Sequence, residues 1–402
     1  MPRDPREAPP PPDATPQSGL AAQTSEWLIR EGRFLENNET ILQQFCERVA
    51  RSGIPIDRVS LHQRAFHPQY RGVSRVWRRG RPLEEKFLDH GIEKTATYLE
   101  SPVRVVTEES RRLEWRLDGN APLTFPVLQE LREAGYTQYV IAPLVYAVGI
   151  TNAISWATRK PSGFSAGELR FFEEILPAYA AVAELKALRR FIGGILTTYV
   201  GSHAGRLILD GQVRRGDVRE ITAALMLVDL RDFTEMSDSL SSRAVIRVLN
   251  QYFDCVMTPI RDHGGEVVEI MGDGVLAMFR QGPHGHAAEA CSRALTAATA
   301  GLAALVERNR KHPSRPLRAG VALHYGTVSY GNIGSGDRMD FTVIGPDVNL
   351  TSRIERLCRE LDRALIMSEA FADTLHRPMW EIGHFEMRGF AKMQRLFELP
   401  QE

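Results

Sequence analysis

The segment EVVEIMGDGVLAMF, residues 266–279, constrains the fold of this chain more than any other stretch. Its two apolar runs, 267–271 and 275–279, are joined by Gly-Asp-Gly, a combination typical of a tight β-hairpin turn. The pattern predicts two antiparallel strands with Asp273 at the tip of the hairpin. Glu269 lies inside the first predicted strand, where a neutral residue is the common choice, so its presence needs a chemical reason.

Length and proline content predict how the chain is divided. At 402 residues it exceeds the usual size of one hydrophobic core, so we expect two domains and a linker. A disordered proline-rich extension is expected over 1–22, a sensor-like regulatory domain over 23–185, a linker helix with a transducing segment over 186–220, and a second domain over 221–399.

The bulk chemistry excludes several function classes. The 50 basic and 50 acidic side chains balance, so the chain lacks the basic surplus that a general nucleic-acid binder needs. Four widely spaced cysteines form no C-x-x-C pair, which argues against a disulfide framework and against a zinc site. We therefore expect a cytoplasmic protein.

Residues 139–158 carry no charge over about the length that a membrane-spanning helix requires. Pro143, Gly149 and Asn152 interrupt this segment and divide it into two shorter apolar runs around a turn. The pattern favours two buried hairpin strands and no integral membrane segment. A membrane span is the alternative.

The order of patterns in residues 23–185 predicts a small α+β domain. Apolar residues at helical spacing are followed by a strand-like run, a short helix, the apolar hairpin, and a helix that opens with the capping-box pattern Ser165 to Glu168. In layout only, this domain resembles the GAF and PAS sensor domains, which would receive a small-molecule or protein signal. A dimerisation domain without a ligand is the alternative.

An apolar stripe at helical spacing continues through residues 182–196. Such a stripe belongs either to the core of a domain or to a parallel dimer seam between two copies of the chain. A dimer seam here would connect the first domain with the second.

A carboxylate at the end of a strand opens the second domain. The apolar run 223–228 leads into Asp229, and a turn with Phe233 and Thr234 begins a helix. The backbone N–H groups of such a turn can hold phosphate oxygens, while the carboxylate holds a divalent cation. If the strands are neighbours, Asp229 meets Asp273 at one edge, where two carboxylates need a cation; two solvated turn aspartates are the alternative.

A third motif, DFTVIGPDVNLTSRIERL, occupies residues 340–357. A strand leads through Gly-Pro into a helix that carries Asn349 and Arg353 one turn apart on one face. An amide and a guanidinium suit a substrate with a sugar and a phosphate, since Arg stabilises charge on a phosphoryl group. An ordinary helix surface is the alternative.

The three motifs together resemble the catalytic domain of the class III adenylate and guanylate cyclases, from about residue 221 to 399. The quoted segments LVDLRDFT, GGEVVEIMGDGVLAMF and FTVIGPDVNLTSR correspond to catalytic segments of that family. The resemblance implies a ferredoxin-like βαββαβ domain that works as a head-to-tail homodimer with composite active sites. It also implies a lyase that uses two Mg²⁺ or Mn²⁺ ions for cyclic nucleotide biosynthesis from GTP or ATP in signal transduction.

The same resemblance assigns roles to residues. Asp229, Asp273 and the main-chain carbonyl of Leu230 would bind the metal ions. Asn349 and Arg353 of the other subunit would orient the ribose and stabilise the transition state. Arg388 or Lys392 would bind the triphosphate, with Phe233 and Thr234 in the phosphate-binding turn.

Three positions bear on substrate and activity. At the two base-reading positions this chain has Glu269 and Thr342, and a carboxylate accepts hydrogen bonds from guanine N1–H and its 2-amino group, whereas adenine N1 needs a donor. We therefore favour GTP slightly over ATP. The alternatives are an adenylate cyclase with an atypical base pocket and a degenerate homologue that binds nucleotide. Asp232 would support the degenerate homologue, because the family usually has Gly at this position. A diguanylate cyclase is disfavoured because its GG-[DE]-EF loop is absent.

Overall fold

The computed structural model describes residues 16–64, 70–119, 122–282 and 285–400, and the chain divides into two compact units, Met1–Ile195 and Leu196–Glu402. Most of the predicted proline-rich extension, residues 1–15, lies outside the described residues. Residues 16–22, which we assigned to that extension, instead begin helix α1 (Pro16–Arg30), because Ala21 is 2% exposed and belongs to the core of the first unit.

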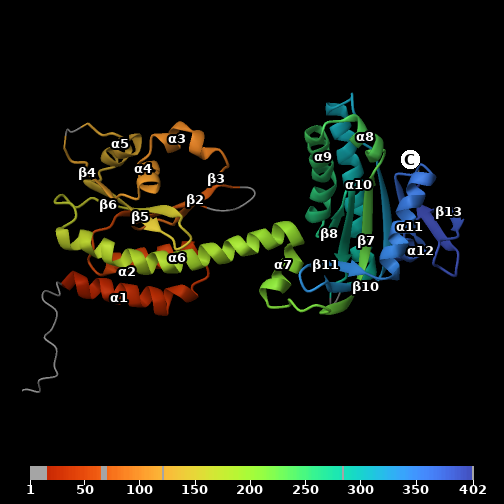
Figure 1. Cartoon of the computed structure of the whole chain (residues 1–402), viewed down its shortest axis with the longest axis horizontal. Helices are drawn as coiled ribbons and strands as arrows, with labels where there is room; N and C mark the ends of the chain where they lie inside the picture. Colours follow the sequence, from red (N-terminus) through yellow and green to blue (C-terminus); the bar gives the residue numbers. More distant parts are fainter. Residues whose placement is uncertain (1–15, 65–69, 120–121, 283–284, 401–402) are drawn as a thin grey trace, which may run out of the picture. The chain divides into compact units, whose positions relative to one another are not determined.

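Within the described residues, the first unit is built on a six-stranded antiparallel sheet in the order β3-β2-β1-β6-β5-β4 (Figure 1). The predicted small α+β domain with a central antiparallel sheet is confirmed. Its strands are β1 (Arg58–Arg64), β2 (Gly72–Arg78), β3 (Glu84–Leu88), β4 (Leu113–Arg116), β5 (Gln138–Val145) and β6 (Thr151–Thr158).

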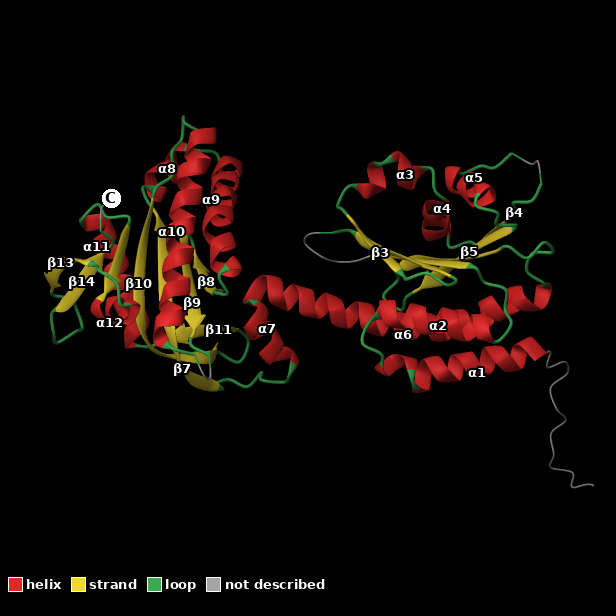
Figure 2. Cartoon of the chain, turned by 180° about the vertical axis from the view of Figure 1, so that it is seen from behind, coloured by secondary structure: helices red, strands yellow, loops and turns green. Residues whose placement is uncertain are grey.

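Helices cover both faces of this sheet, as both views of the chain show (Figures 1 and 2). One face carries the larger core, which includes Leu42, Trp156 and Phe172, and the other carries a smaller core around Leu128 and Tyr139. The larger core is covered by α1, η1 (Gly32–Phe34), α2 (Asn38–Arg51) and α6 (Ala166–Val200), and the opposite side holds η2 (Ile92–Lys94), α3 (Ala96–Leu99), α4 (Pro102–Glu109) and α5 (Pro126–Glu133).

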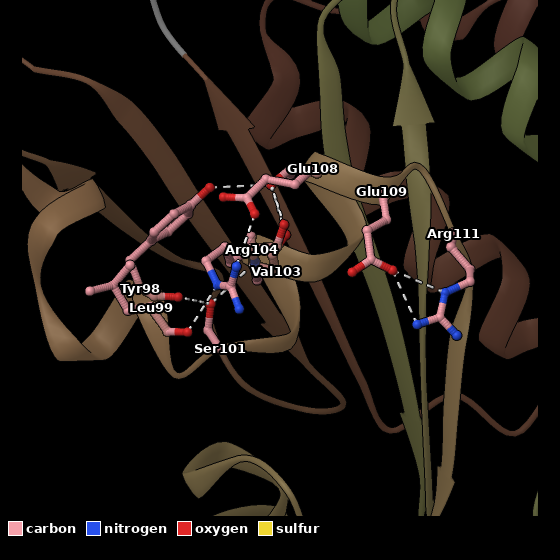
Figure 3. A network of polar contacts seen from close by, with 9 residues as sticks. Tyr98, Leu99, Ser101, Val103, Arg104, Glu108, Glu109 and Arg111 are labelled. Carbon is pink, nitrogen blue, oxygen red and sulfur yellow. Dashed lines mark hydrogen bonds and ion pairs between the residues drawn. The ribbon is translucent and has the colours of Figure 1, made fainter.

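Side-chain caps fix where two of these helices begin. Around α4, Ser101 accepts a hydrogen bond from the backbone N–H of Arg104, whose guanidinium pairs with Glu108 at 2.9 Å (Figure 3). At the start of α6, Glu168 accepts from the backbone N–H of Ser165 at 2.6 Å, and Ser165 Oγ accepts from that of Glu168 at 3.3 Å. The predicted capping box is therefore confirmed.

The uncharged segment 139–158 is a buried hairpin. β5 and β6 pair antiparallel, with Val140 opposite Trp156 and Ala142 opposite Ile154. Among the described residues, no helix has both the length and the apolar character needed to cross a bilayer. The hairpin prediction is confirmed and the membrane alternative at this segment is wrong.

In the described part of the second unit, an eight-stranded sheet has the order β13-β14-β12-β10-β7-β9-β8, with β11 paired to β10. The elements β7, α9, β8, β9, α10 and β10 form the predicted βαββαβ arrangement. The strands are β7 (Val218–Leu230), β8 (Glu266–Met271), β9 (Gly274–Arg280), β10 (Ala319–Gly334), β11 (Met339–Ile344), β12 (Leu365–Ser368), β13 (Trp380–Phe385) and β14 (Gln394–Glu398).

Two layers of helix enclose this sheet (Figure 2). The core on one face, around Tyr252 and Phe279, is covered by α9 and α10, and the core on the other face, around Leu225 and Ile354, is covered by α11. The helices are α7 (Ser202–Leu209), α8 (Phe233–Ser239), α9 (Ser242–Asp262), α10 (Ala287–Lys311), α11 (Pro346–Glu360), α12 (Glu369–Ala372) and η3 (Asp373–Leu375).

The boundary between the units differs from the one we predicted. The second unit begins at Leu196, within the segment we assigned to the linker, because α7 buries Ala204, which is 1% exposed, in the same core as Leu225. β7 likewise begins at Val218, before the predicted start at 221. Much of the predicted transducing segment is therefore part of the second unit.

Candidate active site

Strand pairing brings Asp229 and Asp273 to one edge of the second sheet. β7 and β9 are antiparallel neighbours with Val228 opposite Val275, and Asp229 follows Val228 while Asp273 lies in the turn that enters β9. The backbone at Gly274 is so close that a Cβ added there would lie 3.5 Å from Asp229 Oδ1. Burial raises the pKa of the Asp273 carboxyl, and the negative charge of Asp229 raises it further.

These two carboxylates fit a hard divalent cation. In the described ranges, no group of three or more His, Cys, Asp and Glu side chains gathers where it could hold a metal ion, so the pair needs additional oxygen ligands. The main-chain carbonyl of Leu230, next to Asp229, and the phosphates of a substrate are donors of that kind. Because each aspartate disfavours the charge of the other, a cation between them would relieve the repulsion.

The C-terminal half of α11 adds side chains that our sequence analysis missed. Arg359 Nη2 donates to Asp229 Oδ2 at 2.5 Å. Glu355 is 8% exposed, and burial together with the charge of Asp229 raises its pKa to about 7. Arg231 lies 3.9 Å from Glu355 and donates to the carbonyl oxygen of Arg363. The four-residue spacing of Glu355 and Arg359 on one helix face was the available signal.

The turn after Asp229 has an unusual backbone. Asp232 is left-handed, with φ of 59°, and α8 begins at Phe233, which packs on the core, while Thr234 is exposed. The Asp232 carboxylate accepts from Arg318 Nη2 at 3.2 Å, and Arg318 also lies 3.6 Å from Asp362. Arg318, which we did not single out from the sequence, is therefore a cation at the edge of this turn.

The two positions predicted to read the base are in direct contact. Thr342 Oγ1 on β11 donates to Glu269 Oε2 on β8 at 3.0 Å. A β-bulge makes this contact possible. Val267 pairs with Ala277 and Glu269 pairs with Leu276, so β8 has one more residue than β9 between these two pairs. Without the bulge, strict alternation would direct Glu269 to the α9 and α10 face of the sheet rather than to the face that α11 covers.

Asn349 and Arg353 are both exposed on α11 and lie away from the aspartates of the same chain. Asp347, at the start of α11, accepts from the backbone N–H of Thr327, which lies on β10 opposite Thr222, near the other end of β7 from Asp229. Arg359, which contacts Asp229, lies ten residues after Asn349 on α11, a distance of about 15 Å along the helix axis. The structure does not bring the predicted catalytic pair to the predicted metal aspartates within one chain.

Arg388 and Lys392 lie in the exposed connection between β13 and β14. β14 is separated from β7 by β12 and β10, and Met367 pairs with Phe397, so this connection lies toward the end of the sheet opposite to Asp229. The structure therefore does not bring either side chain to Asp229 of the same chain. Both lie toward the end of the sheet at which α11 begins.

Comparison with known proteins identifies the second unit. Residues 218–397 match the family model of the adenylate and guanylate cyclase catalytic domain. The curated relatives include adenylate cyclase 1 of Rhizobium meliloti (strain 1021), 31% identical over 154 residues, with 38% of this chain and 23% of the relative covered. An adenylate cyclase of Anabaena cylindrica is 28% identical over 200 residues, with 48% and 38% covered. The matched region is thus well under half the length of both relatives.

A solved structure also matches part of this chain. The crystal structure of the guanylyl cyclase Cya2 is 30% identical, with 46% of this chain and 93% of that chain covered and a TM-score of 0.40. The family model, the order of the βαββαβ elements and the aspartate pair at the end of β7 all fall in residues 218–397. Residues 218–397 therefore form a class III adenylate and guanylate cyclase catalytic domain.

Proposed function

We propose that this protein is a nucleotide cyclase. It converts a purine nucleoside triphosphate, GTP slightly in preference to ATP, into the 3′,5′-cyclic monophosphate and pyrophosphate. The observation that carries the proposal is the juxtaposition of Asp229 and Asp273 at the end of β7, inside a domain of this family. The product would serve as a second messenger.

The reaction is an intramolecular displacement at the α-phosphorus. The ribose 3′-oxygen forms a bond to the α-phosphorus as the bond to the bridging oxygen of pyrophosphate breaks, and the hydroxyl proton passes to solvent. When bound, two Mg²⁺ or Mn²⁺ ions would supply Lewis acidity toward the 3′-hydroxyl and the phosphates. Asp229, Asp273 and the Leu230 carbonyl would hold these ions.

The other predicted side chains position the substrate. The backbone of the turn at Phe233 and Thr234 would receive phosphate oxygens, and Asn349 would orient the ribose. Arg353 would stabilise the charge that develops on the phosphoryl group. Arg388 or Lys392 would bind the triphosphate.

The separation of these groups supports a homodimer with composite active sites. Asn349 and Arg353 are exposed and lie far along α11 from the aspartates, so a single chain holds only half of a site. A second copy in a head-to-tail arrangement would place them against the aspartates of the first. Each dimer would then contain two sites.

Substrate preference rests on Glu269. Its Oε2 accepts from Thr342, and Oε1 has no hydrogen-bond partner among the described protein groups, so it is available to guanine N1–H and the 2-amino group. One observation supports the alternative substrate, ATP: the two curated relatives above are named adenylate cyclases. Thr342 can donate or accept a hydrogen bond and so does not decide between the two bases.

The first unit would act as the regulatory part. Its antiparallel sheet domain is the reason to propose a GAF-like or PAS-like sensor for a small-molecule or protein signal. On α6, Leu185, Leu188 and Ile192 are 51%, 44% and 41% exposed at the alternating spacing of three and four that a parallel two-stranded seam uses. This seam would join two copies through α6.

The test is a product assay. Purified protein is incubated with Mn²⁺ or Mg²⁺ and each of the four ribonucleoside triphosphates, and cyclic products are identified by mass. Cyclic GMP above cyclic AMP is expected. Cyclic AMP alone would favour the atypical adenylate cyclase, and no cyclic product, with or without the first unit, would leave the degenerate homologue that binds nucleotide.

A further inference from the structure

The metal-binding carboxylate Asp229 already has a cationic partner in its own chain. Arg359 Nη2 lies 2.5 Å from Asp229 Oδ2, and the Asp229 side chain is only 19% exposed. A charge-assisted hydrogen bond from a guanidinium orients a largely buried carboxylate and offsets part of its negative charge. Arg359 therefore occupies one of the two Asp229 oxygens that could bind a cation.

The charge of Arg359 reaches the neighbouring carboxylates as well. Asp273 lies beside Asp229 at the same edge of the sheet, and Glu355 lies one turn before Arg359 on α11. Glu355 has its own cationic partner, Arg231, at 3.9 Å, whereas Arg359 contacts Asp229. Arg359 is therefore the counter-ion of the aspartate pair.

Arg356, one turn earlier on α11, provides a contrast. Its guanidinium pairs with Glu360 at 3.0 Å, and its side chain is 72% exposed against 61% for Arg359. The two arginines share a helix, a charge and a similar exposure, but only Arg359 contacts a proposed metal ligand. Arg356 is therefore a matched control.

We propose that Arg359 is a positioning residue of the metal site, which holds Asp229 in place, screens it from Asp273, and competes with the divalent cation for the Asp229 carboxylate. The proposal rests on the proposed function, because it takes Asp229 and Asp273 as the cation ligands. Arg359 would therefore have two effects. It stabilises the two adjacent carboxylates when no cation is bound, and it lowers their affinity for a divalent cation. A bound cation has to displace the guanidinium from Asp229.

The experiment measures Mn²⁺ binding to the full chain from the decrease in the free Mn²⁺ signal in electron paramagnetic resonance, without nucleotide. Arg359→Gln should bind Mn²⁺ about three- to tenfold more tightly than the unsubstituted protein, the range expected for losing a partly exposed charged partner. Arg359→Lys, which keeps the charge, should restore most of the weaker binding. Arg356→Gln should change the affinity by less than about twofold.

Thermal unfolding provides a second measurement on the same proteins. In EDTA, Arg359→Gln should unfold at a lower temperature than Arg356→Gln, because the two aspartates lose their counter-ion. Added Mn²⁺ should raise the unfolding temperature of Arg359→Gln more than that of the unsubstituted protein.

Asp229→Asn separates failure of this proposal from failure of the proposed function. If Asp229→Asn weakens Mn²⁺ binding but Arg359→Gln and Arg356→Gln behave alike, the role of Arg359 is wrong and the metal site stands. If Asp229→Asn leaves Mn²⁺ binding unchanged, the metal site itself is wrong, and the role of Arg359 fails with it. Weaker Mn²⁺ binding in Arg359→Gln would also contradict the proposed competition between Arg359 and the cation for the Asp229 carboxylate.

Discussion

Thr342 on β11 donates a hydrogen bond of 3.0 Å to Glu269 on β8, so the two side chains expected to read the base form one unit. The bulge between Val267 and Glu269 directs the carboxylate to the face of the sheet that carries β11 and α11. A substitution at either position should therefore act on base recognition and leave the fold intact.

Glu269→Lys should shift substrate preference from GTP toward ATP. The ammonium group donates to adenine N1, whereas it repels the N1–H and 2-amino donors of guanine, so the ratio of kcat/KM for GTP to that for ATP should fall by at least about tenfold. Steady-state assays with both triphosphates give the ratio. Glu269→Gln is the control, because it removes the charge without adding a cation; an unchanged ratio in Glu269→Lys would show that this position does not read the base.

Asp232→Gly should improve binding of the triphosphate. The substitution removes a carboxylate that pairs with Arg318 and places glycine at a left-handed position that favours it, so KM should fall about two- to fivefold without loss of stability. Asp362→Asn is the control, since it also contacts Arg318 but lies outside the turn. If KM rises in Asp232→Gly, the Asp232 carboxylate assists binding and our interpretation of this position is wrong.

Glu355 should make stability fall as pH rises. Its pKa is about 7 in the folded protein against an ordinary value of 4.5, so the folded state binds the proton more tightly. The stability that this binding contributes is lost as pH rises from about 4.5 through about 7. Glu355→Gln should remove this dependence and raise the free energy of unfolding at pH 8 by about 1–3 kcal/mol. Denaturant titrations at several pH values in EDTA measure the effect; parallel curves for the two proteins would contradict it.

Leu188→Cys should form a disulfide between two copies of the chain. Leu188 is 44% exposed on α6 and occupies the centre of the proposed seam, where the equivalent residues of a parallel dimer face each other. Mild oxidation followed by non-reducing electrophoresis detects the dimer. Arg189→Cys, on the neighbouring position, should cross-link much less; equal cross-linking at both positions would argue against a seam along this face.

Much of this architecture could be predicted because its signals are local. Gly-Asp-Gly between two apolar runs indicated the β8–β9 hairpin, and an apolar run ending in Asp229 indicated β7. Once these strands pair, the meeting of Asp229 and Asp273 follows from the register alone.

The parts that could not be predicted depend on contacts between distant segments. Arg359 reaches Asp229 across 130 positions of sequence, and its four-residue spacing from Glu355 does not single it out, because Arg356 has the same spacing from Glu360. The bulge before Glu269 is a single-residue change of register in an otherwise regular strand. The early start of the second unit depends on how α7 packs, which helical spacing alone does not reveal.

Complementation between inactive variants tests the composite site most directly. Asp273→Ala removes a metal ligand and Arg353→Ala removes a transition-state contact, so each homodimer should lose nearly all cyclase activity. If equal amounts of the two variants exchange subunits freely, about half of all dimers combine both variants. Each of these has one intact site of two, so the mixture should recover about a quarter of the activity of the unsubstituted protein. No recovery from a mixture shown to form mixed dimers would contradict an active site shared between two chains.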